Sequence, residues 1–137
     1  MNFTSNTWDL LSMFYSVTTT QNYLHTHYTK DSIIESKRKS FENAPVFIHY
    51  LKSAEIYYKE ANSISLEVQP VLLFYGFIQL IKACLLSIDP SYPSSATLLA
   101  HGVTTRKRKK QQYEFLKDEI KVQRNGLFSY MSSKMFH

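Results

Sequence analysis

A run of basic residues near the C-terminus carries the strongest chemical signal in the sequence. The stretch HGVTTRKRKK, residues 101–110, ends in five consecutive cations. Guanidinium and ammonium groups attract the phosphates of RNA or DNA, and the counterions that they release drive binding. The hydroxyl and imidazole groups before the cations, with a backbone N–H, are expected to add hydrogen bonds to the same oxygens. The predicted phosphate- or nucleic-acid-binding residues are therefore His101, Gly102, Thr104, Thr105, Arg106, Lys107, Arg108, Lys109 and Lys110.

The distribution of charge supports this interpretation but leaves two alternatives open. Residues 1–100 hold 7 Lys+Arg and 8 Asp+Glu, a net charge of −1, whereas residues 101–137 hold 9 and 3, a net charge of +6. A block of like charges repels itself, so it is also typical of a solvated loop, or of a surface that receives an acidic protein partner. Nothing in the run reads bases, so RNA or another polyphosphate would bind through its charge, whatever its sequence.

Other polar residues give no spacing that fixes a reaction. His25 and His27 could share a metal if their segment were extended, but two imidazoles alone make no metal site. Asp118 and Glu119 are adjacent, and adjacent positions on a strand point to opposite faces. We therefore assign no catalytic residue, no metal site and no cofactor, and the sequence favours a binding protein over an enzyme.

Composition predicts a mainly helical domain of 137 residues. Aromatic residues make up 15% of the chain, while Gly and Pro number only 3 and 4, which disfavours a turn-rich sandwich or barrel. The N-terminus lacks the pattern of a signal peptide, so we expect a cytoplasmic protein. The apolar run 71–88 contains Gln79 and Lys82, and we interpret it as a buried helix rather than a membrane span, with Cys84 in the core.

The elements that position these residues can be placed from hydrophobic periodicity and breakers. Two short helices are expected first, the second capped within Thr18–Thr20, and then a polar connection over 29–42. Asn43 resembles an N-cap, with Pro45 in the first turn of a helix that runs to about Asn62. The next helix, at about 70–88, is the expected centre of a helical bundle.

The C-terminal part changes character. SSATLLAHG is expected to form a short helix closed by Gly102. Apolar residues alternate on both sides of Asn125-Gly126, with Ile120 and Val122 before it and Phe128 and Tyr130 after it. This pattern predicts a β-hairpin at about 119–131. The predicted fold is thus mainly α, with a central buried helix and a C-terminal hairpin.

Four blocks of the chain carry a resemblance to a known family. They are, in order, NAPVFIHYLKSAEIYYKEA, PVLLFYGFIQLIKACLL, HGVTTRKRKK and FLKDEIKVQRNGLF. They resemble the N-terminal part of the YaaC-like family of bacterial proteins, found in Bacillus and its relatives. The length predicts that residues 1–137 form a single domain. The resemblance implies that this domain is the N-terminal part of a longer architecture, and it brings no established activity.

A more distant similarity is to HEPN-like helical domains, through a helix that carries Pro70, Tyr75 and the pair Lys82-Ala83. Catalytic members of that group cut RNA with an Arg followed four to six residues later by a His. Here Arg124 has no His at that spacing, and His101 precedes Arg106.

Three functions follow from these observations. The first is a non-catalytic protein that contacts RNA or another phosphate-rich ligand through residues 106–110. The second is a protein–protein interaction or scaffold domain, in which aromatic helices pair with a partner or with a second copy. The third, an HEPN-type ribonuclease, has an incomplete motif in this sequence.

Overall fold

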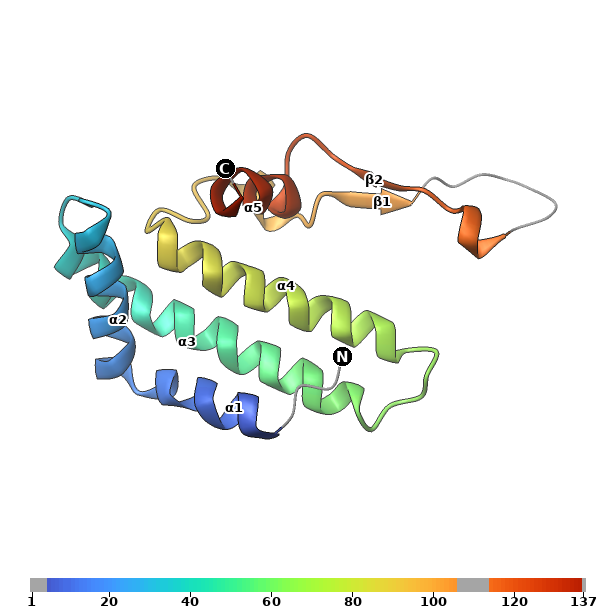
Figure 1. The fold of residues 1–137 in the computed structure, drawn as a ribbon, viewed down its shortest axis with the longest axis horizontal. Helices are drawn as coiled ribbons and strands as arrows, with labels where there is room; N and C mark the ends of the chain where they lie inside the picture. Colours follow the sequence, from blue (N-terminus) through green and yellow to red (C-terminus); the bar gives the residue numbers. More distant parts are fainter. Residues whose placement is uncertain (1–4, 106–113, 137) are drawn as a thin grey trace. The chain divides into compact units, whose positions relative to one another are not determined.

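The computed structural model describes residues 5–105 and 114–136, which form two compact units, Met1–Tyr92 and Pro93–His137 (Figure 1). The first unit is helical and the second contains a short β-ribbon. The mainly α class with a C-terminal hairpin is thus confirmed.

Over residues 5–92 the first unit contains four α-helices, which are α1 (Ser5–Leu11), α2 (Val17–Lys30), α3 (Ser36–Ala61) and α4 (Gln69–Ile88). A 3-10 turn, Ser12–Tyr15, joins α1 to α2. The cap of α2 is Ser16, whose Oγ accepts a hydrogen bond from the Thr19 amide at 3.3 Å, and not one of the predicted threonines. The long helix α3 packs against both α2 and α4 (Figure 1).

The core of this unit forms where α2, α3 and α4 meet. Each helix contributes residues at three- or four-residue spacing, which places them on one face. The buried cluster consists of Leu24, Tyr28, Ala44, Phe47, Leu51, Ala83 and Leu86. Full burial of a large apolar side chain contributes about 1.5–3 kcal/mol, so this cluster holds the three helices together.

The N-terminal end of α3 differs from the prediction. The segment 36–42, predicted as part of a polar connection, forms the first two turns of the helix, and the true connection is only Asp31–Glu35. Ion pairs from Arg38 to Glu35 and Glu42, both at 2.8 Å, run along this segment, and Ser40 is buried. Side-chain pairs at these spacings support a helix, and polar composition alone does not reveal them.

Asn43 and Pro45 therefore lie inside α3 and not at its start. Proline removes one backbone donor, so the carbonyl of Phe41 loses its helical partner. The Phe41 side chain is exposed, so this turn of the helix faces water, which can take the place of that donor. Ala44 and Phe47, on either side of Pro45 in the sequence, are buried in the core cluster, and their burial stabilises the helix through this turn. The predicted end of the helix near Asn62 is confirmed.

The predicted helix at about 70–88 is confirmed as α4, with Pro70 in its first turn and Asp89-Pro90 directly after it. Ile78, Ala83, Leu85 and Leu86 are buried. Close packing continues at Gly76, where an added Cβ would lie 2.9 Å from the ring of Tyr58 on α3.

Part of the α4 surface is exposed. Val71, Tyr75 and Phe77 each leave two fifths or more of their area in solvent, and Cys84 is exposed rather than in the core as predicted. A helix that is apolar all round does not show by periodicity which of its sides lies in the core. Among the described residues, α4 is also the one helix long and apolar enough to cross a bilayer, judged by length and composition alone.

The second unit contains a 3-10 turn at Ala96–Leu99, strand β1 (Val103–Thr105), a 3-10 turn at Phe115–Lys117, strand β2 (Ile120–Val122) and helix α5 (Leu127–Met135). The two strands are antiparallel, with Val103 opposite Val122 and Thr105 opposite Ile120. The hairpin is therefore present, but β2 pairs with β1 and not with residues beyond Asn125-Gly126. The predicted second strand at Phe128–Tyr130 is helical.

The reason lies in the conformation of two glycines. A type I′ hairpin turn over Asn125-Gly126 needs a positive φ at both of these residues. Gly126 has a positive φ, but Asn125 does not. Gly126, with φ 139°, instead packs on Gly102, so that a Cβ added at Gly126 would lie 2.7 Å from the Gly102 Cα. The Leu127 amide then donates to the Ala100 carbonyl at 2.8 Å, and the fully buried Leu127 begins α5.

Candidate functional site

The β-ribbon gives the predicted phosphate-binding segment a defined geometry at its two ends. Thr104 on β1 lies directly opposite Lys121 on β2. Opposed residues of an antiparallel pair project from the same face, so a hydroxyl and an ammonium group share one face of the ribbon. Both side chains are exposed. Thr105 lies on the other face, opposite Ile120, which is 73% exposed.

His101 and Gly102 have structural roles where the ribbon meets α5. The His101 ring accepts a hydrogen bond from the Val103 amide through Nδ1, at 3.2 Å, and its carbonyl accepts one from the Phe128 amide at 3.2 Å. The Gly102 carbonyl accepts from the Gln123 amide at 2.7 Å, and Gly102 is buried with φ 74°. Of the predicted site residues that the structure describes, Thr104 and Thr105 are thus exposed, while His101 and Gly102 help to shape the turn.

The cations Arg106, Lys107, Arg108, Lys109 and Lys110 lie outside the described residues. In the chain they directly follow β1, and β2 returns beside β1 fifteen residues after Thr105. The sequence interpretation missed two further cations on the return path, Lys121 and Arg124, both exposed. Lys121 could have been recognised from the alternation of side chains along a strand, because its neighbours Ile120 and Val122 project from the other face of the ribbon.

The other polar residues considered from the sequence do not converge. His25 and His27 lie on α2, and two residues apart on a helix they point in nearly opposite directions. The His25 Nδ1 atom lies 3.3 Å from Ser36 Oγ, and the His27 ring packs on Tyr23 with 4.4 Å between centroids. Asp118 and Glu119 are exposed just before β2. Within residues 5–105 and 114–136, no three His, Cys, Asp or Glu residues are grouped so that they could hold a metal ion.

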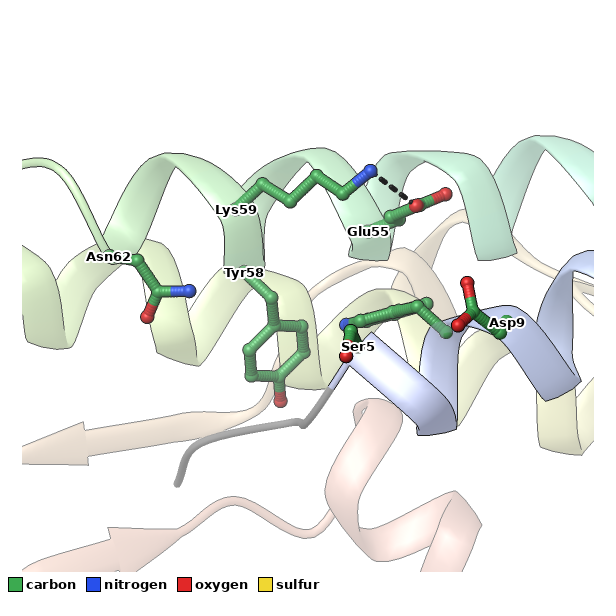
Figure 2. A pocket seen from close by; sticks show the side chains of 7 residues that line it. Ser5, Asp9, Glu55, Tyr58, Lys59 and Asn62 are labelled. Carbon is green, nitrogen blue, oxygen red and sulfur yellow. Dashed lines mark ion pairs between the residues drawn. The ribbon is translucent and has the colours of Figure 1, made fainter.

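A pocket that sequence reasoning did not find lies between α1 and α3 (Figure 2). Its volume is about 290 Å³. Side chains of both helices point into it, several of them charged or aromatic. The lining residues are Ser5, Trp8, Asp9, Glu55, Tyr58, Lys59 and Asn62.

The aromatic part of the pocket is fixed by the core. Trp8 and Tyr58 are buried, and their ring centroids are 5.8 Å apart with the planes tilted by 46°. Together with Ala54 they form a small apolar cluster that joins α1 to α3. Leu11, Leu73 and Leu80 pack against this cluster, which holds both rings in place.

Glu55 is the most enclosed carboxylate of the pocket, with 18% of its side chain exposed. The Lys59 Nζ atom lies 2.6 Å from its Oε1 atom (Figure 2), and the Tyr15 hydroxyl donates a hydrogen bond to its Oε2 atom. Burial by itself raises the pKa of Glu55, but the two hydrogen bonds and the charge of Lys59 outweigh it and lower the pKa below its ordinary value. Burial, the hydrogen bond to Glu55 and the negative charge of Glu55 raise the pKa of Tyr15. At neutral pH Glu55 is therefore ionised and Tyr15 protonated.

Asp9 lies on α1, with an exposed side chain at the opposite wall of the pocket (Figure 2). Its backbone carbonyl accepts a hydrogen bond from Ser12 Oγ at 2.7 Å. Among the described residues, no ion pair involves the Asp9 carboxylate. Among the described residues that line the pocket, two side chains are thus negative and one is positive, and the positive one is bound to Glu55.

Comparison with known protein families shows which family the sequence matches. A family model described as YaaC-like Protein matches residues 12–137, which is most of the chain. No match to this chain was found among the curated proteins or the solved structures. The description of the family names no activity.

Proposed function

The chain belongs to the YaaC-like family, and we propose that it is a non-catalytic protein that binds phosphate-rich ligands, single-stranded RNA in particular. The proposed contact surface is the β1–β2 ribbon together with the basic connection 106–110. The single observation that carries the proposal is the pairing of Thr104 with Lys121, because the connection that contains the five cations begins and ends on this ribbon.

The supporting argument is electrostatic. Pairing of β1 with β2 places Lys121 beside Thr104, which stands two residues before the basic run in the sequence. Exposed cations within a Debye length of about 8–10 Å reinforce one another toward an anion. Lys117 is already paired with Glu114 at 2.6 Å, so it contributes less than Lys121. A ribbon with Thr104 and Lys121 on one face therefore supplies hydrogen-bond donors beside the basic run.

The expected binding has a defined salt dependence. If four or five cations contact phosphates, the logarithm of the affinity falls with the logarithm of the salt concentration at a slope of about −3 to −4, taking ~0.7 per phosphate for a single strand. A fluorescently labelled single strand titrated at about 50 mM and 200 mM salt measures this slope. Arg106→Glu with Arg108→Glu should weaken binding to all sequences alike, because contacts with the backbone carry no sequence information.

The matched control reverses two cations of the helical unit. Lys30 and Lys37 are exposed, and their double reversal to Glu changes the net charge by the same amount. Equal weakening by both double variants would reduce the effect to net charge and contradict a site at residues 106–110. Affinity that does not change with salt would contradict the proposal altogether, and cleavage of the strand would contradict its non-catalytic part.

A second candidate function rests on the exposed apolar side chains of the first unit. Leu66 and Val68, in the connection between α3 and α4, and Val71 at the start of α4 are exposed by 40% or more. Exposed apolar residues that are neighbours in a fold are typical of protein–protein contact surfaces. Sedimentation over a range of concentrations distinguishes the two candidates, because a scaffold that pairs with its own copy changes its mass, whereas RNA binding does not require this.

A further inference from the structure

The bend between β2 and α5 contains the one Asn-Gly pair of the sequence, Asn125-Gly126. We infer that Asn125 is a site of spontaneous deamidation, at which the backbone nitrogen of Gly126 attacks the side-chain carboxamide of Asn125. The product is an aspartate or an isoaspartate at this position. The site lies within the second unit, and its chemistry does not depend on RNA binding by the ribbon.

The residue after an asparagine decides how easily this attack proceeds. The ring closes through the backbone nitrogen of that residue, and a side chain on it hinders the approach. Glycine has no Cβ and is the least restricted residue in φ and ψ. Every other asparagine of the sequence precedes a residue with a side chain, as Asn62 precedes Ser63. Asn125 is therefore the asparagine of this chain with the least steric hindrance to ring closure.

The two reacting groups are free of competing hydrogen bonds. The Asn125 side chain is exposed, and in the part of the chain that the structure describes neither its carboxamide nor the Gly126 N–H has a hydrogen-bond partner. Asn43 is the opposite case, because its carboxamide donates to the Tyr28 hydroxyl and to the Pro90 carbonyl. Residues 124–126 form a bend outside β2 and α5, so the hydrogen bonds of these two elements do not engage the reacting groups.

The reaction needs only water as a co-reactant, and no group is oxidised or reduced. The Gly126 N–H gives its proton to hydroxide, and the nitrogen forms a bond to Cγ of the Asn125 carboxamide. The bond between Cγ and the side-chain nitrogen breaks, and this nitrogen takes a proton from water and leaves as ammonia. Water then opens the cyclic imide. Opening at Cγ gives aspartate, and opening at the main-chain carbonyl gives isoaspartate.

The modification changes the joint between the ribbon and α5. Isoaspartate lengthens the main chain by a carbon directly before Gly126, which is packed so closely that a Cβ added there would lie 2.7 Å from the Gly102 Cα. The Leu127 amide donates to the Ala100 carbonyl at 2.8 Å, and we expect it to lose its protection from hydrogen exchange in the isoaspartate form. Either product also places a carboxylate next to Arg124.

The test incubates the intact protein at body temperature, at neutral and at mildly alkaline pH. Peptide mass spectrometry follows the replacement of NH2 by OH at each asparagine, and a protein isoaspartyl methyltransferase labels the isoaspartate. Deamidation at Asn125 should be at least about tenfold faster than at Asn62, which is exposed but precedes Ser63. It should also be faster at the higher pH, because hydroxide removes the Gly126 proton.

Two controls connect the reaction to this bend. Asn125→Gln keeps the carboxamide but needs a larger ring, so it should abolish both signals in this peptide, and circular dichroism verifies that it folds. The wild-type protein in urea gives the rate without the fold. The folded protein should react within about fivefold of that rate, because no hydrogen bond protects the pair. No deamidation at Asn125, equal rates at Asn125 and Asn62, or a folded protein slower than this range would each overturn the inference.

Discussion

The side-chain amide of Asn43, in the third turn of α3, donates a hydrogen bond to the hydroxyl of Tyr28 on α2 at 3.1 Å. The same amide donates to the carbonyl of Pro90, just after α4, at 2.9 Å. The Tyr28 hydroxyl in turn donates to the Leu86 carbonyl on α4 at 2.6 Å. One buried polar network thus ties together the three helices of the core.

The first prediction is that Tyr28→Phe destabilises the helical unit by about 1–3 kcal/mol. The substitution leaves the ring in place but removes the hydroxyl, so the Leu86 carbonyl loses its donor and the Asn43 amide one of its acceptors. Chemical denaturation followed by circular dichroism measures the change. Tyr57→Phe is the control, because Tyr57 is only partly buried and stacks on Tyr75 through its ring. A Tyr28→Phe protein as stable as the control would show that the network contributes nothing.

The second prediction concerns the contact between Gly102 and Gly126. Gly126→Ala places a methyl group 2.7 Å from the Gly102 Cα, at a φ of 139° that side-chain-bearing residues rarely adopt. The ribbon and the start of α5 should therefore open. In hydrogen exchange, protection of the Gln123 and Leu127 amides is expected to fall, because their acceptors, the carbonyls of Gly102 and Ala100, move away.

Two comparisons limit this effect to the second unit. Amides in the middle of α3 should keep their protection, and Asn125→Ala, next to Gly126 but exposed, should leave Gln123 and Leu127 protected. Unchanged protection in Gly126→Ala would mean that the glycine pair does not hold the ribbon to α5.

The third prediction is a pH dependence of stability that arises from Glu55. Its pKa is lower in the folded protein than the ordinary value of 4.5, so its ionised form stabilises the fold. A group with a depressed folded pKa contributes its stabilisation above the unfolded pKa and loses it as the pH falls through the folded pKa. Stability should therefore decrease below a pH of about 4.5, and Glu55→Gln should make this decrease shallower.

The measurement is the free energy of unfolding as a function of pH, for the wild type, Glu55→Gln and Tyr15→Phe. Tyr15→Phe removes one of the two donors to Glu55, so it should remove part of the pH dependence that Glu55→Gln removes. Identical slopes in all three proteins below this pH would contradict the assignment. Lys59→Met provides a further variant, since the same carboxylate then loses its charged partner.

The boundaries of α4 could be predicted because they depend on local chemistry. Proline at a first turn and proline after a helix act through a ring that fixes φ and removes a donor, and neither effect depends on the rest of the fold. The start of α3 could not be predicted in the same way. Asn43 has the side chain of an N-cap, but its amide finds partners on α2 and after α4, which are distant in the sequence.

The C-terminal ribbon shows the same division. The sequence by itself determined that Ile120–Val122 is a strand and that basic residues follow Thr105, because side-chain alternation and charge are properties of the segment. The partner of the strand and the helix after Gly126 were decided by the contact between Gly102 and Gly126, twenty-four residues apart. Likewise, no sequence motif connects Trp8 and Asp9 with Glu55. Only the packing of α1 on α3 brings these residues around one pocket. Local propensity acts over a few residues, whereas a site between two helices exists only when burial of apolar surface brings them together.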